Sequence, residues 1–506
     1  MRVLQVASEV SPFAKTGGLA DVAGALPGAL ARLGCDVTVV MPAHREVFTR
    51  GLPIEPTGWE FEIPVGTRKQ RATIHQARIP GHDPGIAGAE GTPPVTVYLI
   101  GNDSYFDRPT LYGGAEDYSD NAERFIFFSR AALELANRFE QPCDIIHSHD
   151  WQTALVPAYQ KILADNWPRL ARARTLHTIH NMAYQGVFWH WDMLLTGIDW
   201  RYFNWQQMEY FGQLNLLKAG IVFADMVTTV SPTYAREIQS APGGCSLEGV
   251  LSGRGDSLMG IVNGIDTHTW NPRTDLHLPR PYDATSVAEG KSAAKAALAT
   301  RLGHAAPDSR PLVAYVGRLA EQKGIGLLFD LLSRLAGSGR AKFVILGTGD
   351  PRAEESLRQM AAAYPGTIDL VIGFDEGLAH LVQGAADMLL MPSLYEPCGL
   401  TQLYALAYGT IPIVRATGGL VDTVVDAGPE ALADGTASGF VFDAVDGGAL
   451  VHAVERALEL HADSGRWLAL VRRVVAQDWS WDASARKYLR LYERALAAEP
   501  VPARVP

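Results

Sequence analysis

The sequence predicts an α/β protein made of two doubly wound domains, each a parallel sheet covered by helices on both faces. Two distant stretches follow one plan: a buried strand, a short loop with glycine and lysine, and a helix with apolar periodicity. The first stretch starts with the strand of residues 3–8 and the second with the strand of residues 312–316. A chain of 506 residues is also too long for one ordinary core, so two domains are expected.

Each stretch begins a series of short β-rich runs separated by helical patterns. This alternation favours parallel strands that are joined by helices. In the first domain we expect further strands at residues 36–41, 95–100, 144–147, 176–179 and 226–230. In the second domain we expect them at residues 342–346, 369–372, 388–391 and 411–414.

The domain boundary is predicted where a strand at residues 261–266 gives way to a polar, proline-bearing stretch at residues 271–282. The expected domains are therefore residues 1–262 and 263–482. A C-terminal helix with a frayed tail should follow at residues 483–506. Residues 81–94 are rich in glycine and proline, which predicts a surface insertion in the first domain.

Composition excludes several classes of protein. There are 55 acidic and 44 basic residues, and the net charge of −11 gives no reason to expect nucleic acid or an anionic membrane as a partner. The 4 cysteines are widely spaced, which argues against a zinc ribbon or a disulfide scaffold and fits a reducing compartment. The N-terminal segment lacks the features of a signal peptide, and no apolar run is long enough to span a bilayer. We therefore expect a cytoplasmic protein.

The segment around Glu396 is the part of the sequence that indicates the reaction most clearly. Glu396 immediately precedes the turn Pro397-Cys398-Gly399, and an apolar helix follows. The free N–H groups of Gly399, Leu400 and Thr401 would open that helix, and helix N-termini attract anions. A carboxylate beside such a phosphate cradle suits an enzyme that holds sugar hydroxyls and a departing diphosphate. The alternative reading is that Glu396 only caps the helix.

Two loops in equivalent places carry positive charge. Lys15, Gly17 and Gly18 follow the first strand, and Arg318 and Lys323 follow the strand that opens the second domain. The glycines let the backbone approach a ligand closely. If the domains face each other across a deep cleft, these three cations could compensate a leaving diphosphate. Solvated surface cations are the alternative.

Polar residues also end two neighbouring strands of the first domain. Asp150 and Trp151 follow one strand and His180 follows the next. We expect Asp150 to accept and His180 to donate hydrogen bonds to a hydroxyl-rich ligand, with Trp151 offering an apolar face to a sugar ring. Ordinary strand-end polar groups that are satisfied within the protein are the alternative. No second cluster of the same type completes a metal site, so no metal is expected.

Two further features lie in the second domain. The turn Thr417-Gly418-Gly419 feeds a helix and suggests another backbone contact to phosphate or sugar. Phe374 follows the strand of residues 369–372 and could stack on a base, although an aromatic residue in such a turn is more typical of core.

Together these motifs resemble those of the bacterial glycogen synthases and plant starch synthases, which are retaining glycosyltransferases of the two-Rossmann, GT-B type. The resemblance is collinear from residue 1 to about residue 492. Its motifs are residues 15–22, 149–151, 180–181, 183–186, 231–235, 263–266, 317–319, 322–324, 396–402 and 417–420.

The resemblance implies roles for individual residues. It places Glu396, His180, Asp150 and Lys15 among the catalytic residues. It implies donor binding by Lys15, Gly17, Gly18, Trp151, Asn263, Arg318, Lys323, Phe374, Cys398, Gly399, Leu400 and Thr401, with Phe374 stacking on adenine. Many retaining enzymes of this fold carry a second glutamate eight residues after the first. Tyr404 stands there in this chain, so the ribose contact stays unassigned.

The implied reaction transfers α-glucose from ADP-glucose to the non-reducing 4-OH of an α-1,4-glucan with retained configuration and no cofactor. No carboxylate stands out as a nucleophile, which favours a mechanism in which acceptor and leaving group share one face of the sugar. Two alternatives stay open: a synthase that uses UDP-glucose, and a glucan-binding homologue without activity. A dehydrogenase is disfavoured because Gly17-Gly18 is not G-x-G-x-x-G. A phosphorylase would need a lysine that binds pyridoxal phosphate, and no motif here resembles one.

Overall fold

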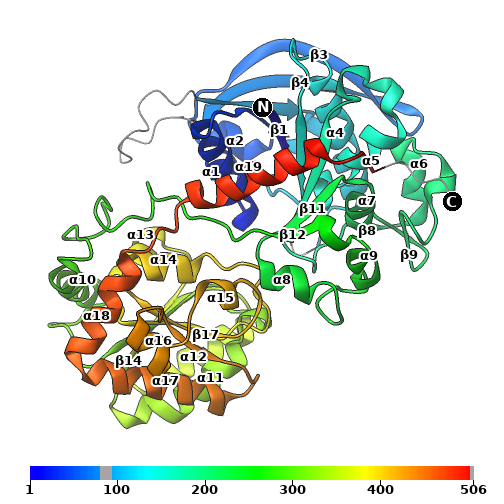
Figure 1. Ribbon diagram of the computed structural model, residues 1–506. Helices are drawn as coiled ribbons and strands as arrows, with labels where there is room; N and C mark the ends of the chain where they lie inside the picture. Colours follow the sequence, from blue (N-terminus) through cyan, green and yellow to red (C-terminus); the bar gives the residue numbers. More distant parts are fainter. Residues whose placement is uncertain (80–93, 115, 502–506) are drawn as a thin grey trace. The chain divides into compact units, whose positions relative to one another are not determined.

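The computed structural model describes residues 1–79, 94–114 and 116–501, which fall into two compact units (Figure 1). Unit 1 comprises Met1–Asn263 and Trp481–Pro506, and unit 2 comprises Gly264–Ser480. The insertion predicted at residues 81–94 lies outside the described residues except for Pro94.

Unit 1 is built on a nine-stranded sheet. In spatial order its strands are β12 (Leu258–Gly260), β11 (Met226–Thr229), β7 (Arg174–Ile179), β6 (Ile145–His149), β1 (Arg2–Val6), β2 (Asp36–Pro42), β5 (Val95–Gly101), β4 (Arg68–Ile79) and β3 (Glu55–Val65). The strands from β12 to β5 run parallel, with Val3 opposite Val37 on one side and Ile145 on the other. The predicted parallel series is thus confirmed for this part of the sheet.

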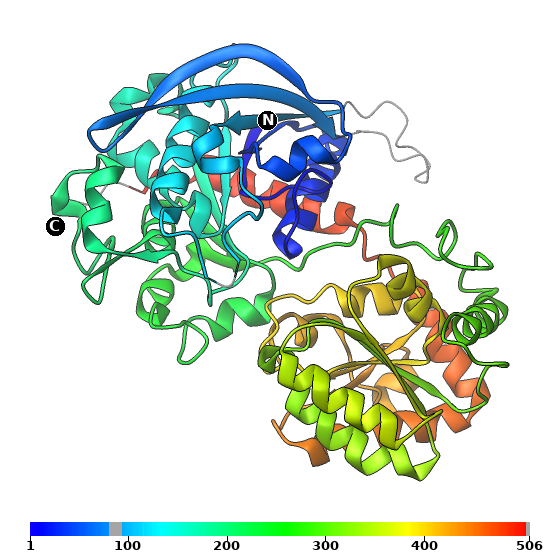
Figure 2. The ribbon, with the colours of Figure 1, turned by 180° about the vertical axis from the view of Figure 1, so that it is seen from behind.

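The edge of this sheet departs from the prediction. β3 and β4 form a long antiparallel hairpin, and β4 pairs antiparallel with β5 (Figure 2). Opposite charges face each other across it, with Lys69 Nζ 2.8 Å from Glu62 Oε2 and Arg71 paired with Glu60. These polar faces are exposed, so the hairpin lacks the continuous apolar runs that reveal a buried strand.

Helices complete unit 1, together with a small antiparallel sheet. The helices are α1 (Gly18–Arg32), α2 (Arg45–Thr49), α3 (Asp103–Phe106), α4 (Asn121–Ala136), α5 (Leu155–Ile162), α6 (Met193–Thr196), α7 (Leu216–Phe223), α8 (Pro232–Glu237), α9 (Glu248–Ser252) and α19 (Trp481–Ala497). The small sheet has the order β8 (Val187–Phe188), β10 (Gln213–Asn215), β9 (Glu209–Tyr210).

The C-terminal helix α19 is part of the unit 1 core and lies beside α1 (Figure 1). Arg32 Nη2 lies 2.6 Å from Asp482 Oδ1, and the buried Tyr492 hydroxyl lies 2.8 Å from His147 Nδ1. The described residues after the helix are not frayed, because the N–H of Val501 donates to Asp225 Oδ1 (2.9 Å). Helix α19 and the described residues after it therefore belong to unit 1.

Unit 2 is a six-stranded, all-parallel sheet with helices on both faces (Figures 1 and 2). Its strand order is β15 (Ile368–Ile372), β14 (Lys342–Gly347), β13 (Leu312–Val316), β16 (Met388–Met391), β17 (Ile411–Arg415), β18 (Phe440–Phe442). Its helices are α10 (Val287–Arg301), α11 (Ile325–Leu335), α12 (Pro351–Ala363), α13 (Glu376–Ala385), α14 (Thr401–Ala407), α15 (Gly418–Thr423), α16 (Pro429–Asp434), α17 (Gly447–Ala462) and α18 (Ser464–Val475).

One strand prediction was wrong. Residues 261–266 were expected to form a strand, but β12 ends at Gly260 and the segment leaves the sheet as irregular chain. No helix among the described residues combines the length and apolarity required to cross a membrane.

Candidate active site

Glu396 holds its carboxylate in a buried position between a strand and a helix of unit 2. The segment from β16 to α14 carries it. Glu396 Oε2 lies 2.6 Å from Lys323 Nζ and accepts a hydrogen bond from Ser393 Oγ (3.0 Å). The cap residue of α14 is Leu400, and no side chain caps that helix. The helix-capping reading of Glu396 is therefore wrong, and its carboxylate is held by a cation instead.

The loop after β13 delivers Lys323 to that carboxylate. The N–H of Leu394 donates to the carbonyl of Gln322 (2.8 Å), which ties this loop to the Glu396 segment. Gly324 has φ +71°, and a Cβ there would lie 1.9 Å from the carbonyl oxygen of Pro392, so no other residue fits without displacing the backbone. Arg318, in the same loop, is exposed and donates to Gln322 Oε1 (2.9 Å).

The turn at Gly418-Gly419 positions the Glu396 segment from the other side. A Cβ on Gly418 would lie 2.0 Å from the carbonyl oxygen of Glu396, and one on Gly419 would lie 2.2 Å from that of Cys398. The N–H of Gly419 donates to the Glu396 carbonyl (3.0 Å). These glycines allow two backbone segments to touch, a packing reason that sequence reasoning did not consider.

In unit 1, β6 and β7 bring Asp150 and His180 together. His149 pairs with Thr178 across the two strands, so the residues that follow each strand are neighbours. Asp150 Oδ1 accepts a hydrogen bond from the N–H of His180 (2.7 Å). Burial raises the pKa of the Asp150 carboxyl to about 7 and outweighs the hydrogen bonds from the backbone of His180 and Asn181.

The backbone at Asp150 is also unusual. Its φ of +55° lies in a region that residues other than glycine rarely adopt. Such conformations cost roughly 1–3 kcal/mol and cluster at functional sites. The strained backbone is therefore a second indication, independent of the raised pKa, that Asp150 has a functional role.

His180 belongs to a buried group of neutral histidines. His180 Nε2 lies 3.1 Å from His149 Nδ1, which leaves only Nδ1 of His180 for a ligand. Burial lowers the pKa of His180 to about 3, so the ring is uncharged at neutral pH. Asn263 is buried as well, and its Oδ1 has no hydrogen-bond donor in the described part of the chain.

The Lys15 loop of unit 1 is fixed by a buried carboxylate that sequence reasoning missed. Glu9 accepts hydrogen bonds from the N–H of Thr16 (2.5 Å), the hydroxyl of Thr16 (2.6 Å) and the N–H of Gly17 (3.3 Å). The ammonium of Lys15 itself is half-exposed and lies 2.6 Å from Asp21 Oδ1.

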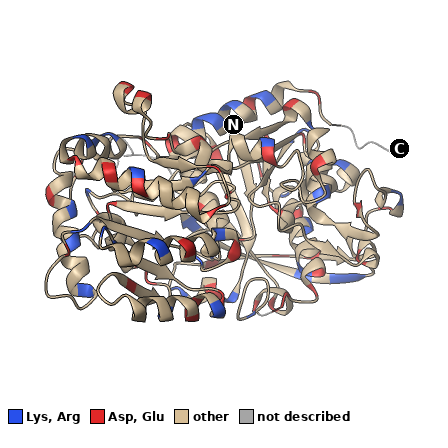
Figure 3. Cartoon of the chain, turned by 90° about the horizontal axis from the view of Figure 1, so that it is seen from below, with Lys and Arg blue, Asp and Glu red and all other residues tan. Residues whose placement is uncertain are grey.

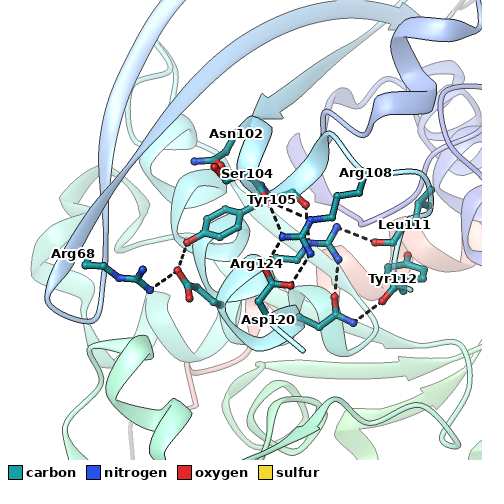
Figure 4. A network of polar contacts seen from close by, with 11 residues as sticks. Arg68, Asn102, Ser104, Tyr105, Arg108, Leu111, Tyr112, Asp120 and Arg124 are labelled. Atoms are coloured by element: carbon teal, nitrogen blue, oxygen red, sulfur yellow. Dashed lines mark hydrogen bonds and ion pairs between the residues drawn. The ribbon is translucent and has the colours of Figure 1, made fainter. Parts of the chain in front are cut away.

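Figure 4 shows a polar network around the segment before α4, and Tyr112 of that network also contacts Glu9. Tyr112 donates its hydroxyl to Glu9 Oε1 (2.6 Å). The fully buried Arg124 donates to the carbonyl oxygens of Tyr105 (2.7 Å) and Leu111 (2.9 Å), which holds the chain that carries Tyr112. No spacing pattern marks Glu9, Tyr112 or Arg124, because Tyr112 lies 103 positions after Glu9 and Arg124 donates to carbonyl oxygens 13 and 19 positions before it.

Charge elsewhere is mixed. Acidic and basic residues alternate along the helices and loops (Figure 3). Within the described residues, no three His, Cys, Asp or Glu side chains gather in a way that could hold a metal ion.

Comparisons with known proteins identify the family of this chain. The family model for the starch synthase catalytic domain matches residues 2–253, and the model for glycosyl transferases group 1 matches residues 299–467. A glycogen synthase from Rhodopirellula baltica is 44% identical over 98% of this chain and 98% of its own length. A glycogen synthase 2 from Geobacter sulfurreducens is 45% identical over 98% of this chain and 99% of its own.

The chain belongs to the glycogen synthase family.

A solved structure extends this result to the fold. The catalytic domain of starch synthase IV from Arabidopsis thaliana, bound to ADP and acarbose, matches with a TM-score of 0.88 and 34% identity over 98% of this chain and 99% of that one. As a member of the glycogen synthase family the chain is a hexosyltransferase with the GT-B fold.

Two aromatic residues differ from expectation in this family member. Trp151 was expected to offer an open face to a sugar, but it is only 8% exposed and packs on Phe125 and Phe188. A Cβ on Gly186 would lie 2.5 Å from its ring, so Trp151 is part of the core. Phe374 is 88% exposed, which contradicts the core reading and leaves its ring open to stacking.

Proposed function

We propose that this protein transfers α-glucose from ADP-glucose to the non-reducing 4-OH of an α-1,4-glucan with retention of configuration. The observation that carries the proposal is the ion pair between buried Glu396 and partly exposed Lys323 at the carboxyl end of the unit 2 sheet. The family membership and the binding of ADP and acarbose by the Arabidopsis relative support it. In open α/β sheets, ligands bind beyond the carboxyl ends of the strands.

The proposal assigns the nucleotide diphosphate to unit 2. Lys323 and Arg318 supply positive charge, and the N–H groups of Gly399, Leu400 and Thr401 add hydrogen-bond donors. Phe374 stacks on the adenine, which its exposure permits. Cys398 is buried, and in the proposal it contributes through the backbone that Gly419 contacts.

The proposal gives residues of each unit a role toward the transferred glucose, as the resemblance to the family implies: Glu396 in unit 2 and strand-end residues in unit 1. Ionised Asp150 and Glu396 accept hydrogen bonds from sugar hydroxyls, and Asn263 offers the oxygen that lacks a partner. If His149 donates from Nδ1, the hydrogen of neutral His180 lies on Nδ1, so His180 can donate to the sugar. Lys15, with the Gly17-Gly18 backbone, adds charge for the phosphates, and unit 1 is the acceptor side.

The reaction breaks the bond between the glucose C1 and the phosphate oxygen, and a bond from the acceptor O4 to C1 forms on the same face. The proton of the acceptor hydroxyl passes to the departing phosphate oxygen, so no protein base is needed. Negative charge grows on the leaving diphosphate, and pre-organised cations stabilise this charge more in the transition state than in the ground state. We place the reaction in the cytoplasm, in line with the four cysteines, none of which forms a disulfide among the described residues.

The test compares donors. Purified protein is incubated with glycogen and either ADP-glucose or UDP-glucose, and the incorporated glucose and its anomeric configuration are measured. We expect α-linked incorporation with turnover clearly favouring ADP-glucose. A preference for UDP-glucose would assign the other nucleotide, and no incorporation from either donor would favour a glucan-binding homologue without activity.

A further inference from the structure

Three histidine rings at the ends of β6 and β7 stand in a row, and the proposed reaction uses only the last of them. The ring of His149 packs on that of His147, with centroids 4.1 Å apart, and its Nδ1 lies 3.1 Å from His180 Nε2. His147 and His149 are fully buried, whereas His180 is partly exposed. The hydrogen bond between His149 and His180 therefore joins the interior of unit 1 to the strand-end site.

Both rings in this hydrogen bond are neutral at neutral pH. Burial lowers the pKa of His149 well below its ordinary value and lowers that of His180 to about 3. When two neutral imidazoles share a hydrogen bond, one nitrogen carries the hydrogen and the other accepts it. The shared hydrogen thus belongs either to His149 Nδ1 or to His180 Nε2.

The second nitrogen of His149 decides between these two arrangements. His149 Nε2 is buried and has no hydrogen-bond partner among the described residues. If the shared hydrogen belonged to His180, His149 would carry its own hydrogen on Nε2, and an N–H group would be buried without an acceptor, which is rare in proteins. If it belongs to His149 Nδ1, only a ring lone pair stays unpaired. The second arrangement is favoured, and it places the hydrogen of His180 on Nδ1.

The orientation of the His149 ring is fixed by its surroundings. The backbone N–H of His149 donates to Thr153 Oγ1 (2.6 Å), and that hydroxyl donates to the His149 carbonyl (2.6 Å). The neighbouring His147 is held at both nitrogens, Nδ1 by the hydroxyl of Tyr492 (2.8 Å) and Nε2 by Thr178 Oγ1 (2.6 Å). Strand β6, strand β7 and helix α19 therefore keep His149 Nδ1 directed at His180.

We propose that His149 is a positioning residue that holds His180 as the Nδ1–H tautomer, so that His180 presents a hydrogen-bond donor to the transferred glucose. The inference rests on the proposed function for the identity of the ligand. An ionised Asp150 can only accept hydrogen bonds, and a sugar hydroxyl can both donate and accept. A donor at His180 beside an acceptor at Asp150 therefore suits neighbouring hydroxyls of one sugar ring.

The first test observes the tautomer directly. In the full-length protein, with nitrogen-15 in its 14 histidines, long-range proton–nitrogen NMR correlations distinguish a ring protonated on Nδ1 from a ring protonated on Nε2. The signals of His180 are those that disappear in His180→Gln. We expect the Nδ1–H form at His180 in the wild type. The Nε2–H form at His180 would overturn the inference.

Two variants of His149 place a side-chain amide at different distances from the backbone. The amide nitrogen of asparagine is as many bonds from Cβ as Nδ1 is in histidine, whereas that of glutamine matches Nε2. His149→Asn should therefore still donate to His180 Nε2 and keep the Nδ1–H form. His149→Gln lacks a donor at that position, so part of His180 should change to the Nε2–H form.

Ligand affinity tests whether the tautomer acts on the sugar. ADP-glucose carries the sugar and ADP lacks it, so the ratio of their affinities, measured by calorimetry without acceptor, reports contacts to glucose. His149→Gln should weaken ADP-glucose binding about tenfold, the scale of one lost hydrogen bond, and leave ADP binding unchanged. His149→Asn should keep the wild-type ratio.

The matched control is His177→Gln. His177 is a fully buried histidine of the neighbouring strand β7, and its Nδ1 lies 2.9 Å from Ser148 Oγ. Its replacement removes the same kind of ring from the same sheet without removing the hydrogen bond to His180. The control should lower the thermal midpoint and leave both the His180 tautomer and the affinity ratio as in the wild type.

These measurements separate the inference from the proposed function. If the tautomer and the affinity ratio follow the predicted pattern but the wild type transfers no glucose, the proposed function fails and the inference stands. If the wild type transfers glucose and His149→Gln keeps either the wild-type tautomer or the wild-type ratio, the inference is overturned. It is also overturned if His149→Asn and His149→Gln lose the ratio equally, because His149 then supports only the fold.

Discussion

The two units place strand-end loops alike but use their buried carboxylates differently. In unit 1, Glu9 and Asp150 accept hydrogen bonds from backbone N–H groups at the strand ends, and Glu9 also accepts from the hydroxyls of Thr16 and Tyr112. In unit 2, Glu396 pairs with the side chains of Lys323 and Ser393. Side-chain partners can move toward a ligand, whereas backbone partners are fixed.

This difference suggests which buried carboxylates contact the substrate and which stabilise the loops around the site. Removing a carboxylate that accepts hydrogen bonds from backbone N–H groups should change the conformation of the loop. A carboxylate that pairs with a lysine can release that lysine to a negatively charged substrate group and then contact the substrate itself. The predictions below change one kind of carboxylate or its partner at a time.

The largest effect is expected at Glu396. Glu396→Gln keeps the size of the side chain but removes its charge, and glucose transfer should fall by about 10²-fold or more. The control is Asp387→Asn, which breaks another buried pair of unit 2, with Lys295 Nζ at 2.6 Å. That control should lower the thermal midpoint and keep turnover. Glucose incorporation and thermal midpoint on one preparation separate the outcomes, and an active Glu396→Gln protein contradicts the account.

The next effect concerns the two cations. Lys323→Ala and Arg318→Ala should each lower kcat by about 10²-fold, because both compensate charge that develops on the leaving group. Lys323→Ala should also lower the thermal midpoint, since it leaves Glu396 buried without its cation. Arg318 is exposed, so its removal should leave the midpoint unchanged. Arg334→Ala, an exposed arginine of α11, is the control for both assays.

The pH profile tests Asp150. The folded pKa of about 7 lies above that of an unfolded aspartate, about 3.9, so the unfolded chain loses its proton first as pH rises. Native stability therefore falls between about pH 4 and 7 because of this group. The Asp150→Asn side chain cannot ionise. The difference in thermal midpoint between this variant and the wild type should therefore increase from about pH 4 to pH 7 and stay constant at higher pH.

Activity should depend on Asp150 in the opposite direction. If the ionised carboxylate binds sugar, kcat/KM of the wild type should rise toward pH 7 and level off. Asp150→Asn should lose this rise together with about tenfold of its activity, as expected for one charged hydrogen bond. A variant that keeps the wild-type rise would assign the pH dependence to another group.

The smallest effect is expected from the network in Figure 4. Tyr112→Phe removes one hydrogen bond from Glu9, which should cost ~1.5–3 kcal/mol of stability and raise the KM for the donor a few-fold through the Lys15 loop. Tyr105→Phe removes a hydroxyl that donates to Glu123 in the same network but away from that loop. It should cost stability with no change in the donor KM, and equal changes in both variants would contradict a positioning role for Tyr112.

Sequence reasoning predicted the parallel strands well, since their apolar runs are set by burial on both faces. It missed the β3–β4 hairpin because the charges at Glu60, Glu62, Lys69 and Arg71 resemble a solvated loop. Among site residues, motif spacing placed Glu396 next to a helix N-terminus. It could not reveal that Lys323 is the partner, because that contact joins residues 73 positions apart.

Burial was the hardest property to predict. The opposite outcomes at Trp151 and Phe374 depend on what packs beside each ring, and the close approach of Gly186 decides it for Trp151. The same holds for Gly418-Gly419, whose glycines are required by contact with Glu396 and Cys398. Such contacts arise only once the chain has folded, so local sequence carries no signal for them.

The affinity for ADP, measured by calorimetry on three variants, tests the division of work between the units most directly. ADP carries the full charge that the leaving group acquires but lacks the sugar. The account predicts that Lys323→Ala weakens ADP binding strongly, while Glu396→Gln and Asp150→Asn bind ADP like the wild type. Unchanged ADP binding in Lys323→Ala, or a loss in Asp150→Asn as large as that in Lys323→Ala, would contradict it.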